Sequence, residues 1–340
     1  MKANNRRWLP ALLLVAIALL LLLSMSIGSV ALPWSELLSQ LWHGHESVNT
    51  IIVTEIRLPR ALLAAAVGAV LGLSGAALQG LFRNPLAESG LVGVSSCASL
   101  GAVIALYYGF SQFAWWVMPG FGMAGALLAV LALFVLAGRG SSITGLLLAG
   151  VAINAFAGAC IALALNFAPN PYAMSEMVYW LLGSFSNRTL NELLFALPFL
   201  LLGSVLVWRQ RRFLDALSLG EETAQTLGFS LPRSRLLLVM GIAASVGAAV
   251  AVSGSIGFVG LLVPHLMRPL VGHQPGRLLS LSALAGAVLL LIADICVQLV
   301  ARFSAITGGA TAELKIGVVT ALFGAPFFLL LIVRLRHRTT

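Results

Sequence analysis

The sequence predicts an all-α polytopic membrane protein in which ten transmembrane helices form a single domain over residues 1–340. Of the 340 residues, 60% are hydrophobic and 9% are charged, whereas soluble domains carry about 25% charged residues. The mean hydropathy is +1.01, and apolar runs of the length that crosses a bilayer, about 20 residues, follow one another along the chain. The ten expected spans are 8–32, 60–82, 91–108, 114–137, 143–167, 190–208, 235–254, 256–272, 278–302 and 314–334.

The distribution of basic residues predicts that both termini are cytoplasmic. With ten spans and a cytoplasmic N-terminus, all but five of the 20 Lys and Arg residues fall in cytoplasmic segments, as the positive-inside rule requires. Omitting the short, proline-interrupted span 256–272 would move the basic C-terminus outside. The first span, 8–32, is longer than the apolar core of a signal peptide, so we expect it to be retained. The five outer cations are Arg57, Arg60, Arg188, Arg302 and Lys315.

The second span, 60–82, carries small residues three or four positions apart, such as Gly68 and Gly72. This spacing allows close contact between helix backbones, so the strip either packs against another helix or lines a pathway. A weak echo of residues 74–86 recurs at 253–266, five spans later. Because five is odd, the echo predicts two five-helix groups related as an inverted repeat, a frequent transporter plan.

The longest cytoplasmic segment, 209–234, contains two short amphipathic helical pieces within 215–228, separated by Gly220. No phosphate-binding loop of the Gly-x-x-x-x-Gly-Lys type exists, because Lys2 and Lys315 are the only lysines and neither follows a glycine. Nucleophile triads and metal-binding spacings are also lacking. We therefore expect no catalytic residue, metal or cofactor, and Cys97, Cys160 and Cys296 are expected to be buried thiols.

Asp294 is the only acid well inside an expected span. An ionisable group at membrane depth is costly and suggests function, so Asp294 could belong to a proton relay. A single acid makes a poor relay, and hydrogen bonding between helices is favoured. A stand-alone ion-coupled secondary transporter remains the alternative of a different class, and a membrane-embedded enzyme or scaffold is a third.

Six strings, in order along almost the whole chain, resemble the permease subunits of ABC importers for iron-siderophores, haem and cobalamin (FecCD-type, type II importers). The most specific are Arg-Asn-Pro-Leu-Ala at 83–87 and Phe-x-Gly-Leu-x-x-Pro-His at 258–265. The six strings are 56–60, 74–96, 146–150, 257–265, 291–294 and 313–328. The resemblance implies a homodimer, or a pair with a paralogous permease, in the bacterial cytoplasmic membrane. It also implies two ATPase subunits that hydrolyse ATP for this non-enzymatic chain, and an external substrate-binding protein.

The resemblance also implies roles for individual residues. The segment 219–228 resembles the coupling helices that dock in a cleft of the ATPase: Leu219, Gly220, Glu221, Glu222, Ala224, Leu227 and Gly228. Arg57 and Arg60 match arginines that pair with glutamates of the binding protein. The place of a third such arginine holds Gln298, and Arg302, one helical turn later, is a candidate replacement. The residues that match the inner gate are Asn84, Leu86, Ile143 and Thr144.

The substrate is the least determined part of the prediction. Small and apolar pathway residues do not identify a ligand, because the binding protein selects it. An iron complex, either a ferric siderophore or haem, is favoured over cobalamin because members that carry iron complexes are more numerous in the family.

Overall fold

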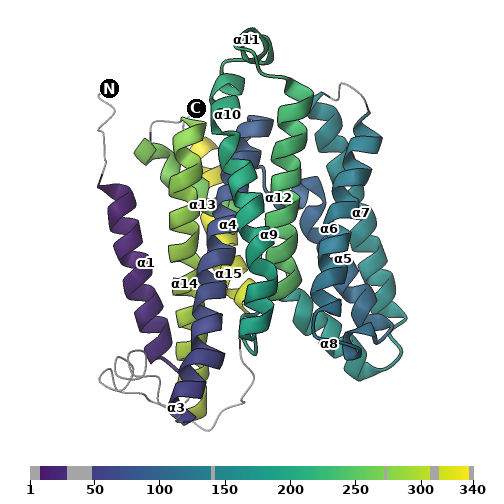
Figure 1. The fold of residues 1–340 in the computed structure, drawn as a ribbon, viewed down its shortest axis with the longest axis vertical. Coiled ribbons are helices and arrows are strands. Elements are labelled where there is room, and N and C mark those ends of the chain that lie inside the picture. The colour runs from purple at the N-terminus through teal and green to yellow at the C-terminus, as the bar shows by residue number, and fades with distance from the viewer. Residues whose placement is uncertain (1–7, 29–47, 139–141, 272–273, 307–313, 337–340) are drawn as a thin grey trace.

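The computed structural model describes residues 8–28, 48–138, 142–271, 274–306 and 314–336, and in these ranges the chain is helical and connected by short turns (Figure 1). The terminal residues 1–7 and 337–340, which were expected in the cytoplasm, lie outside the described ranges. A helix is present at each of the ten predicted spans. These helices are α1 (Leu9–Ser26), α4 (Leu58–Phe82), α5 (Val94–Tyr107), α6 (Val117–Ala137), α7 (Ile143–Asn166), α9 (Leu190–Arg209), α12 (Leu231–Ser253), α13 (Val259–Val271), α14 (Pro275–Ile306) and α15 (Ile316–Arg336).

Seven helices of the described chain are long and apolar enough to cross a membrane, and three predicted spans are shorter apolar helices, α5, α13 and α15. The shortening of α5 and α13 has a local cause. The 3₁₀ helix η2 (Ser89–Val92) precedes α5, and an irregular stretch with Phe258 at a φ of 68° precedes α13. Hydropathy therefore located these segments correctly, but it did not reveal the part of each that lies outside the α-helix.

The sequence did not predict the helix α8 (Pro171–Leu181), which lies between two spans. It begins at Asn170, whose side chain accepts the backbone N–H of Ala173 at 2.8 Å, a typical N-cap. The remaining elements are α3 (Val48–Ile51), η1 (Ile52–Arg57), η3 (Phe110–Gln112), α10 (Arg211–Ser218) and α11 (Glu221–Thr226). The π-helix η1 continues into α4, so that one continuous helix runs from Ile52 to Phe82.

The helices α4 and α12 are the two most buried of the long apolar helices in the described chain. α4 packs chiefly against α14 and α13, whereas α12 packs against α9, α6 and α5. Each central helix therefore contacts the short helix and the following long helix of the other half of the chain. The two central helices thus have corresponding neighbours, while the inverted repeat of two five-helix groups stays a prediction.

The glycines of α4 are packing positions. An added Cβ at Gly68 would come within 2.3 Å of Gly286 O, and one at Gly72 within 2.1 Å of Ser282 O. Both oxygens belong to α14, so these glycines let the two backbones touch. Of the two interpretations left open by the sequence, close helix packing is therefore confirmed for this strip.

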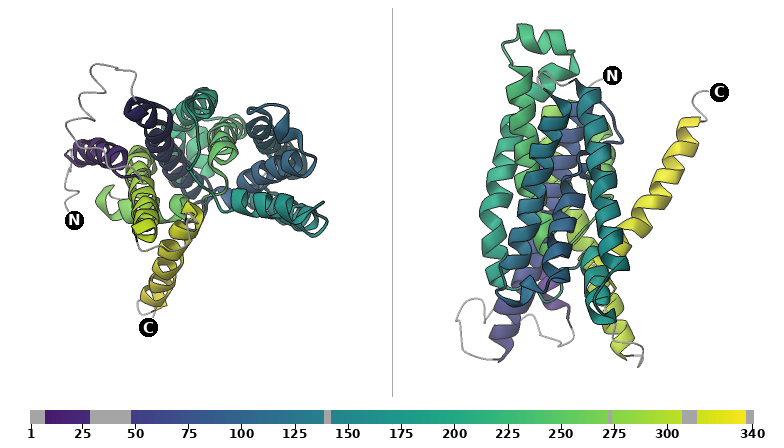
Figure 2. Two further views of the ribbon diagram at one scale, coloured as in Figure 1. Left: turned by 90° about the horizontal axis from the view of Figure 1, so that it is seen from below. Right: turned by 90° about the vertical axis from the view of Figure 1, so that its right-hand side faces the viewer.

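Two ends of the bundle can be distinguished in Figure 1. The helices α10 and α11 lie at the end that we call the α11 end, and α3 and α8 lie at the opposite end, the α3 end. α1 begins and α15 ends at the α11 end. Figure 2 shows that α15 tilts away from the other helices, and its Leu322 and Phe323 are exposed.

Candidate functional site

The helices α10 and α11 form a hairpin that projects beyond the α11 end of the bundle (Figure 1). Gly220 separates them with a φ of 121°, a backbone conformation that favours glycine. α10 is held firmly, because Phe213 and Leu214 are buried and the carboxylate of Asp215 accepts the backbone N–H of Gly276 at 2.7 Å. The first turn of α14 thus anchors the hairpin.

The tip of the hairpin exposes apolar surface. Leu219 directly follows α10 and is 69% exposed, and Leu227 directly follows α11 and is 59% exposed. Glu222 and Gly228 are also exposed, whereas Ala224 is buried against the bundle. The projecting hairpin therefore ends in a tip that carries two exposed leucines beside exposed polar side chains.

Glu221 and Glu222 have different surroundings although they are adjacent. One carboxylate oxygen of Glu221 lies 2.8 Å from a guanidinium nitrogen of Arg235, whose side chain is 5% exposed. The other oxygen lies 3.9 Å from Arg83, at the C-cap of α4. Glu221 therefore faces the bundle, while the side chain of Glu222 faces solvent.

The residues that match the inner gate lie at the same end, where α4 ends and α7 begins. Asn84 accepts the backbone N–H of Leu86 at 2.9 Å, which closes the turn after α4. Leu86 and Thr144 are exposed, and Ile143 is half-buried. The structure thus places two exposed side chains at separate turns of the α11 end.

The α3 end contains a buried polar network that joins α1, α4 and α14. Arg60 binds Asp294 through two nitrogens, with Nη2 to Oδ1 at 2.9 Å and Nε to both oxygens at 3.1 Å. The amide of Gln298 donates to Asp294 at 2.7 Å and to Ser24 Oγ at 3.2 Å. Asp294 is 1% exposed, and the expected hydrogen bonding between helices is confirmed.

The three arginines predicted to dock a binding protein differ in exposure. Arg57 is 7% exposed and donates to the carbonyl oxygen of Met25 at 2.8 Å. Arg60 forms the ion pair with Asp294 described above. Among the three, only Arg302 is exposed. Sequence position alone placed all three at the membrane edge and did not show that two point inward, because their partners are distant in the chain.

Two strings that the sequence singled out meet in the interior. The side-chain amide of Gln79 lies 3.4 Å from the carbonyl oxygens of Gly260 and Leu261, and its oxygen accepts a hydrogen bond from Arg268. Glu88 accepts the backbone N–H of Phe258, just before α13. Burial raises the pKa of the Glu88 carboxyl above its usual value, and this hydrogen bond opposes the rise. α13 is thus fixed to the end of α4 and to the turn that follows it.

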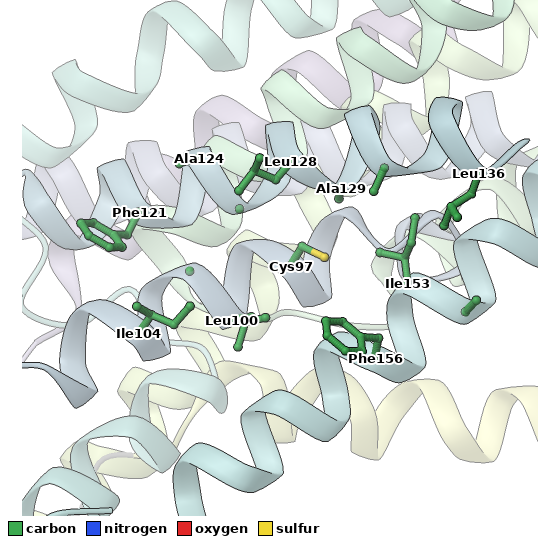
Figure 3. Close-up of a pocket in the computed structure, with 14 residues that line it drawn as sticks. Cys97, Leu100, Ile104, Phe121, Ala124, Leu128, Ala129, Leu136, Ile153 and Phe156 are labelled. Carbon is green, nitrogen blue, oxygen red and sulfur yellow. The ribbon is translucent and has the colours of Figure 1, made fainter. Parts of the chain in front are cut away.

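A cavity of about 610 Å³ lies between α5, α6 and α7 (Figure 3). Leu128 and Ala129 line it from α6, Phe156 from α7, and Leu100 from α5; the Cys97 thiol is its one polar side-chain group. Such a lining offers hydrocarbon contact and no charge, and its single thiol is too few ligands for a metal site. Within the described ranges, three or more His, Cys, Asp or Glu side chains do not gather into a metal-binding group.

The comparisons with known proteins point to the same family and cover almost the whole chain. Residues 14–334 match the FecCD transport family. The chain is 38% identical over 335 residues to the uncharacterized ABC transporter permease protein YvrB of Bacillus subtilis, covering 95% of this chain and 92% of that one. It is 40% identical over 334 residues to the vitamin B12 import system permease protein BtuC of Salmonella paratyphi A, covering 97% and 96%.

A solved structure is similar at the level of the fold. It is a chain of an ABC transporter described as of metal-chelate type, in an inward-facing conformation. The TM-score is 0.81 at 31% sequence identity, and the match covers 96% of this chain and 98% of the other.

Proposed function

This chain belongs to the FecCD transport family, and on that premise we propose that it moves an iron complex, a ferric siderophore or haem, into the cytoplasm. It is the permease of an ABC importer and a multi-pass protein of the bacterial cytoplasmic membrane. The relatives are transport permeases, and ATP is hydrolysed by a separate subunit in such importers. The proposal therefore concerns the cargo, the orientation and the surfaces that bind each partner.

The observation that carries the proposed orientation and ATPase-binding surface is the hairpin of α10 and α11. It projects from the bundle, and it exposes Leu219 and Leu227 at its tip. We assign the α11 end to the cytoplasm, where an ATPase subunit would cover these leucines and contact Glu222 and Gly228. Gly220 allows the sharp change of direction that this shape needs.

At the opposite end, a substrate-binding protein would dock on the outer face. Arg302 is the exposed arginine there and can bind a carboxylate through two parallel hydrogen bonds. Arg57 and Arg60 would contribute only if docking drew them away from Met25 and Asp294. Reversing the charge of Arg57 would also break its contact with Met25, so Arg302 gives the cleaner test of docking.

A second copy of the chain, or a paralogous permease, would complete the pathway. The apolar faces of α7 and α15 are exposed in the single chain, with Leu148, Phe156 and Phe323 among the exposed side chains. Two subunits that pack through these faces would enclose a central pathway. Asn84, Leu86, Ile143 and Thr144 would then form its inner gate at the α11 end.

Cobalamin is the second candidate cargo. One relative at 40% identity is a vitamin B12 import permease, whereas the structural relative is described as of metal-chelate type. The lining of the bundle does not separate the two cargoes, since small and apolar side chains predominate. The iron complex rests on the family as a whole.

Reconstitution tests this proposal directly. The chain would be co-purified with its ATPase, placed in proteoliposomes, and supplied with its binding protein and a ferric siderophore, haem or cobalamin. ATP-dependent accumulation of an iron complex would support the proposal, and accumulation of cobalamin alone would favour the second cargo. Uptake driven by an ion gradient without ATP would contradict both and support a stand-alone transporter.

A further inference from the structure

The two helices of the hairpin are attached to the bundle by different kinds of contact. α10 buries Phe213, Leu214 and Leu217 and is fixed to α14 through Asp215. α11 has six residues, buries Ala224, and places the Glu221 carboxylate against two arginines. α10 is thus held mainly by apolar packing, and α11 has one small buried side chain and a charged link.

The charged link reaches the two central helices of the fold. Arg235 belongs to the second turn of α12, and Arg83 is the C-cap residue of α4. The Arg235 contact is short and the arginine is buried, whereas the Arg83 contact is 3.9 Å long and lies at the surface. Glu221 is 36% exposed, but Arg235 is 5% exposed and Arg83 is 47% exposed. Because a partly buried ion pair is screened less than an exposed one, Arg235 is the stronger of the two partners.

We infer that Glu221 is a positioning residue that transmits movement of α11 to α12, and more weakly to α4. The inference rests on the proposed function, in which an ATPase subunit covers the tip of the hairpin. A displacement of α11 moves the Glu221 carboxylate, and the guanidinium of Arg235 must follow it or lose this 2.8 Å contact. Since α12 contacts α5, α6 and α9, the movement reaches both halves of the bundle.

Glu222 provides a matched control. It is the next residue, on the same helix, with the same charge, but it is exposed and faces away from the bundle. Neutralising Glu222 changes the surface offered to the ATPase and leaves the link to α12 intact. The inference therefore predicts different defects for the two glutamates.

The test compares Glu221→Gln with Glu222→Gln in the reconstituted importer, with ATPase subunits co-purified and the binding protein present. For each variant, uptake is measured per ATP hydrolysed, together with the basal rate of hydrolysis. We expect Glu221→Gln to keep its ATPase subunits and basal hydrolysis but to lose about tenfold in uptake per ATP, within the usual range of coupling between sites. Glu222→Gln alters the docking surface, so it should weaken binding of the ATPase, while the assembled importer keeps the wild-type uptake per ATP.

A charge exchange separates coupling from simple loss of structure. Glu221→Arg combined with Arg235→Glu restores the pair with reversed polarity. Repulsion between Arg83 and the new positive charge at position 221 is weak, because Arg83 is half-exposed and solvent screens it. Recovery of uptake per ATP in the double variant, relative to either single variant, supports the inference even if Glu221→Gln assembles poorly. No recovery, or a wild-type ratio in Glu221→Gln, overturns it.

Failure of the proposed function would look different. In that case the wild-type chain itself would bind no ATPase subunit or would transport without ATP, and both glutamate variants would do the same. A wild-type importer that couples normally, together with two glutamate variants that behave alike, would refute only the role of Glu221.

Discussion

The two ends of the bundle differ in which side chains they bury: the α3 end buries charged groups, and the α11 end exposes apolar ones. At the α3 end, Arg57 and Arg60 turn inward and Asp294 is buried between helices. At the α11 end, Leu219 and Leu227 stand exposed at the tip of a hairpin. The first arrangement satisfies its polar groups within the chain, whereas the second leaves apolar surface that a partner would cover. Mutations at the two ends should therefore separate stability from assembly.

The largest effect on stability is expected from Asp294→Ala. Arg60 and Gln298 would lose their shared acceptor in a nearly water-free site, and removing one partner of a buried ion pair costs about 3–5 kcal/mol. Thermal unfolding in detergent would measure the loss. Arg302→Ala, on the same helix but exposed, should change stability by no more than about 0.5 kcal/mol. Equal stability of the two variants would mean that the network does not hold the α3 end together.

Next in size is the effect of Leu219→Asp on assembly. An apolar anchor at the centre of an interface contributes about 2 kcal/mol or more, so binding of the ATPase should weaken by roughly 30-fold. The unfolding temperature of the permease alone should stay unchanged, because Leu219 is exposed. Quantitative co-purification would measure the binding.

Gln225→Asp is the control for Leu219→Asp, since it adds the same charge to an exposed position of the hairpin without removing apolar surface. If both variants weaken binding equally, charge rather than the leucine is responsible. If Leu219→Asp instead lowers the unfolding temperature, Leu219 contributes to stability and not only to assembly, which would contradict the contrast between the two ends.

A smaller effect is expected from Arg302→Glu at the α3 end. An exposed charge pair contributes about 1 kcal/mol at most, so affinity for the binding protein should fall roughly fivefold. Surface plasmon resonance at low and high salt would show the loss mainly at low salt, because salt screens exposed charges. Arg302→Gln should lie between the wild type and Arg302→Glu. An affinity independent of both variants would exclude Arg302 from the docking surface.

The smallest effect is expected at the start of α9, where Thr189 and Glu192 form a capping box. The backbone N–H of Thr189 donates to Glu192 at 2.8 Å, and that of Glu192 donates to Thr189 Oγ1 at 3.4 Å. Because the contact to Thr189 Oγ1 is long, Thr189→Ala should cost only about 0.5 kcal/mol and speed amide hydrogen exchange in the first turn of α9. Thr189→Ser keeps the acceptor and should show wild-type exchange. Faster exchange at the α11 end as well would show that the two ends are not independent.

Some local features could be read from the sequence because they depend on neighbouring residues. Apolar runs located a helix at each predicted span, and Gly220 between two amphipathic pieces located the hairpin. α8 was missed because an amphipathic helix of 11 residues at the edge of a span has neither the length nor the hydropathy of a crossing. Its Asn170-Pro171 start was the available signal.

The sequence by itself determined the class of protein, the order of its helices, the absence of a phosphate-binding loop and the family. Each of these follows from composition or from strings of adjacent residues. Only the tertiary structure decided that Arg60 is paired with Asp294, that Gly68 and Gly72 pack against α14, and that Glu221 faces the bundle while Glu222 does not. The physical reason is that these contacts join helices far apart in the chain, and hydropathy carries no information about which helices become neighbours.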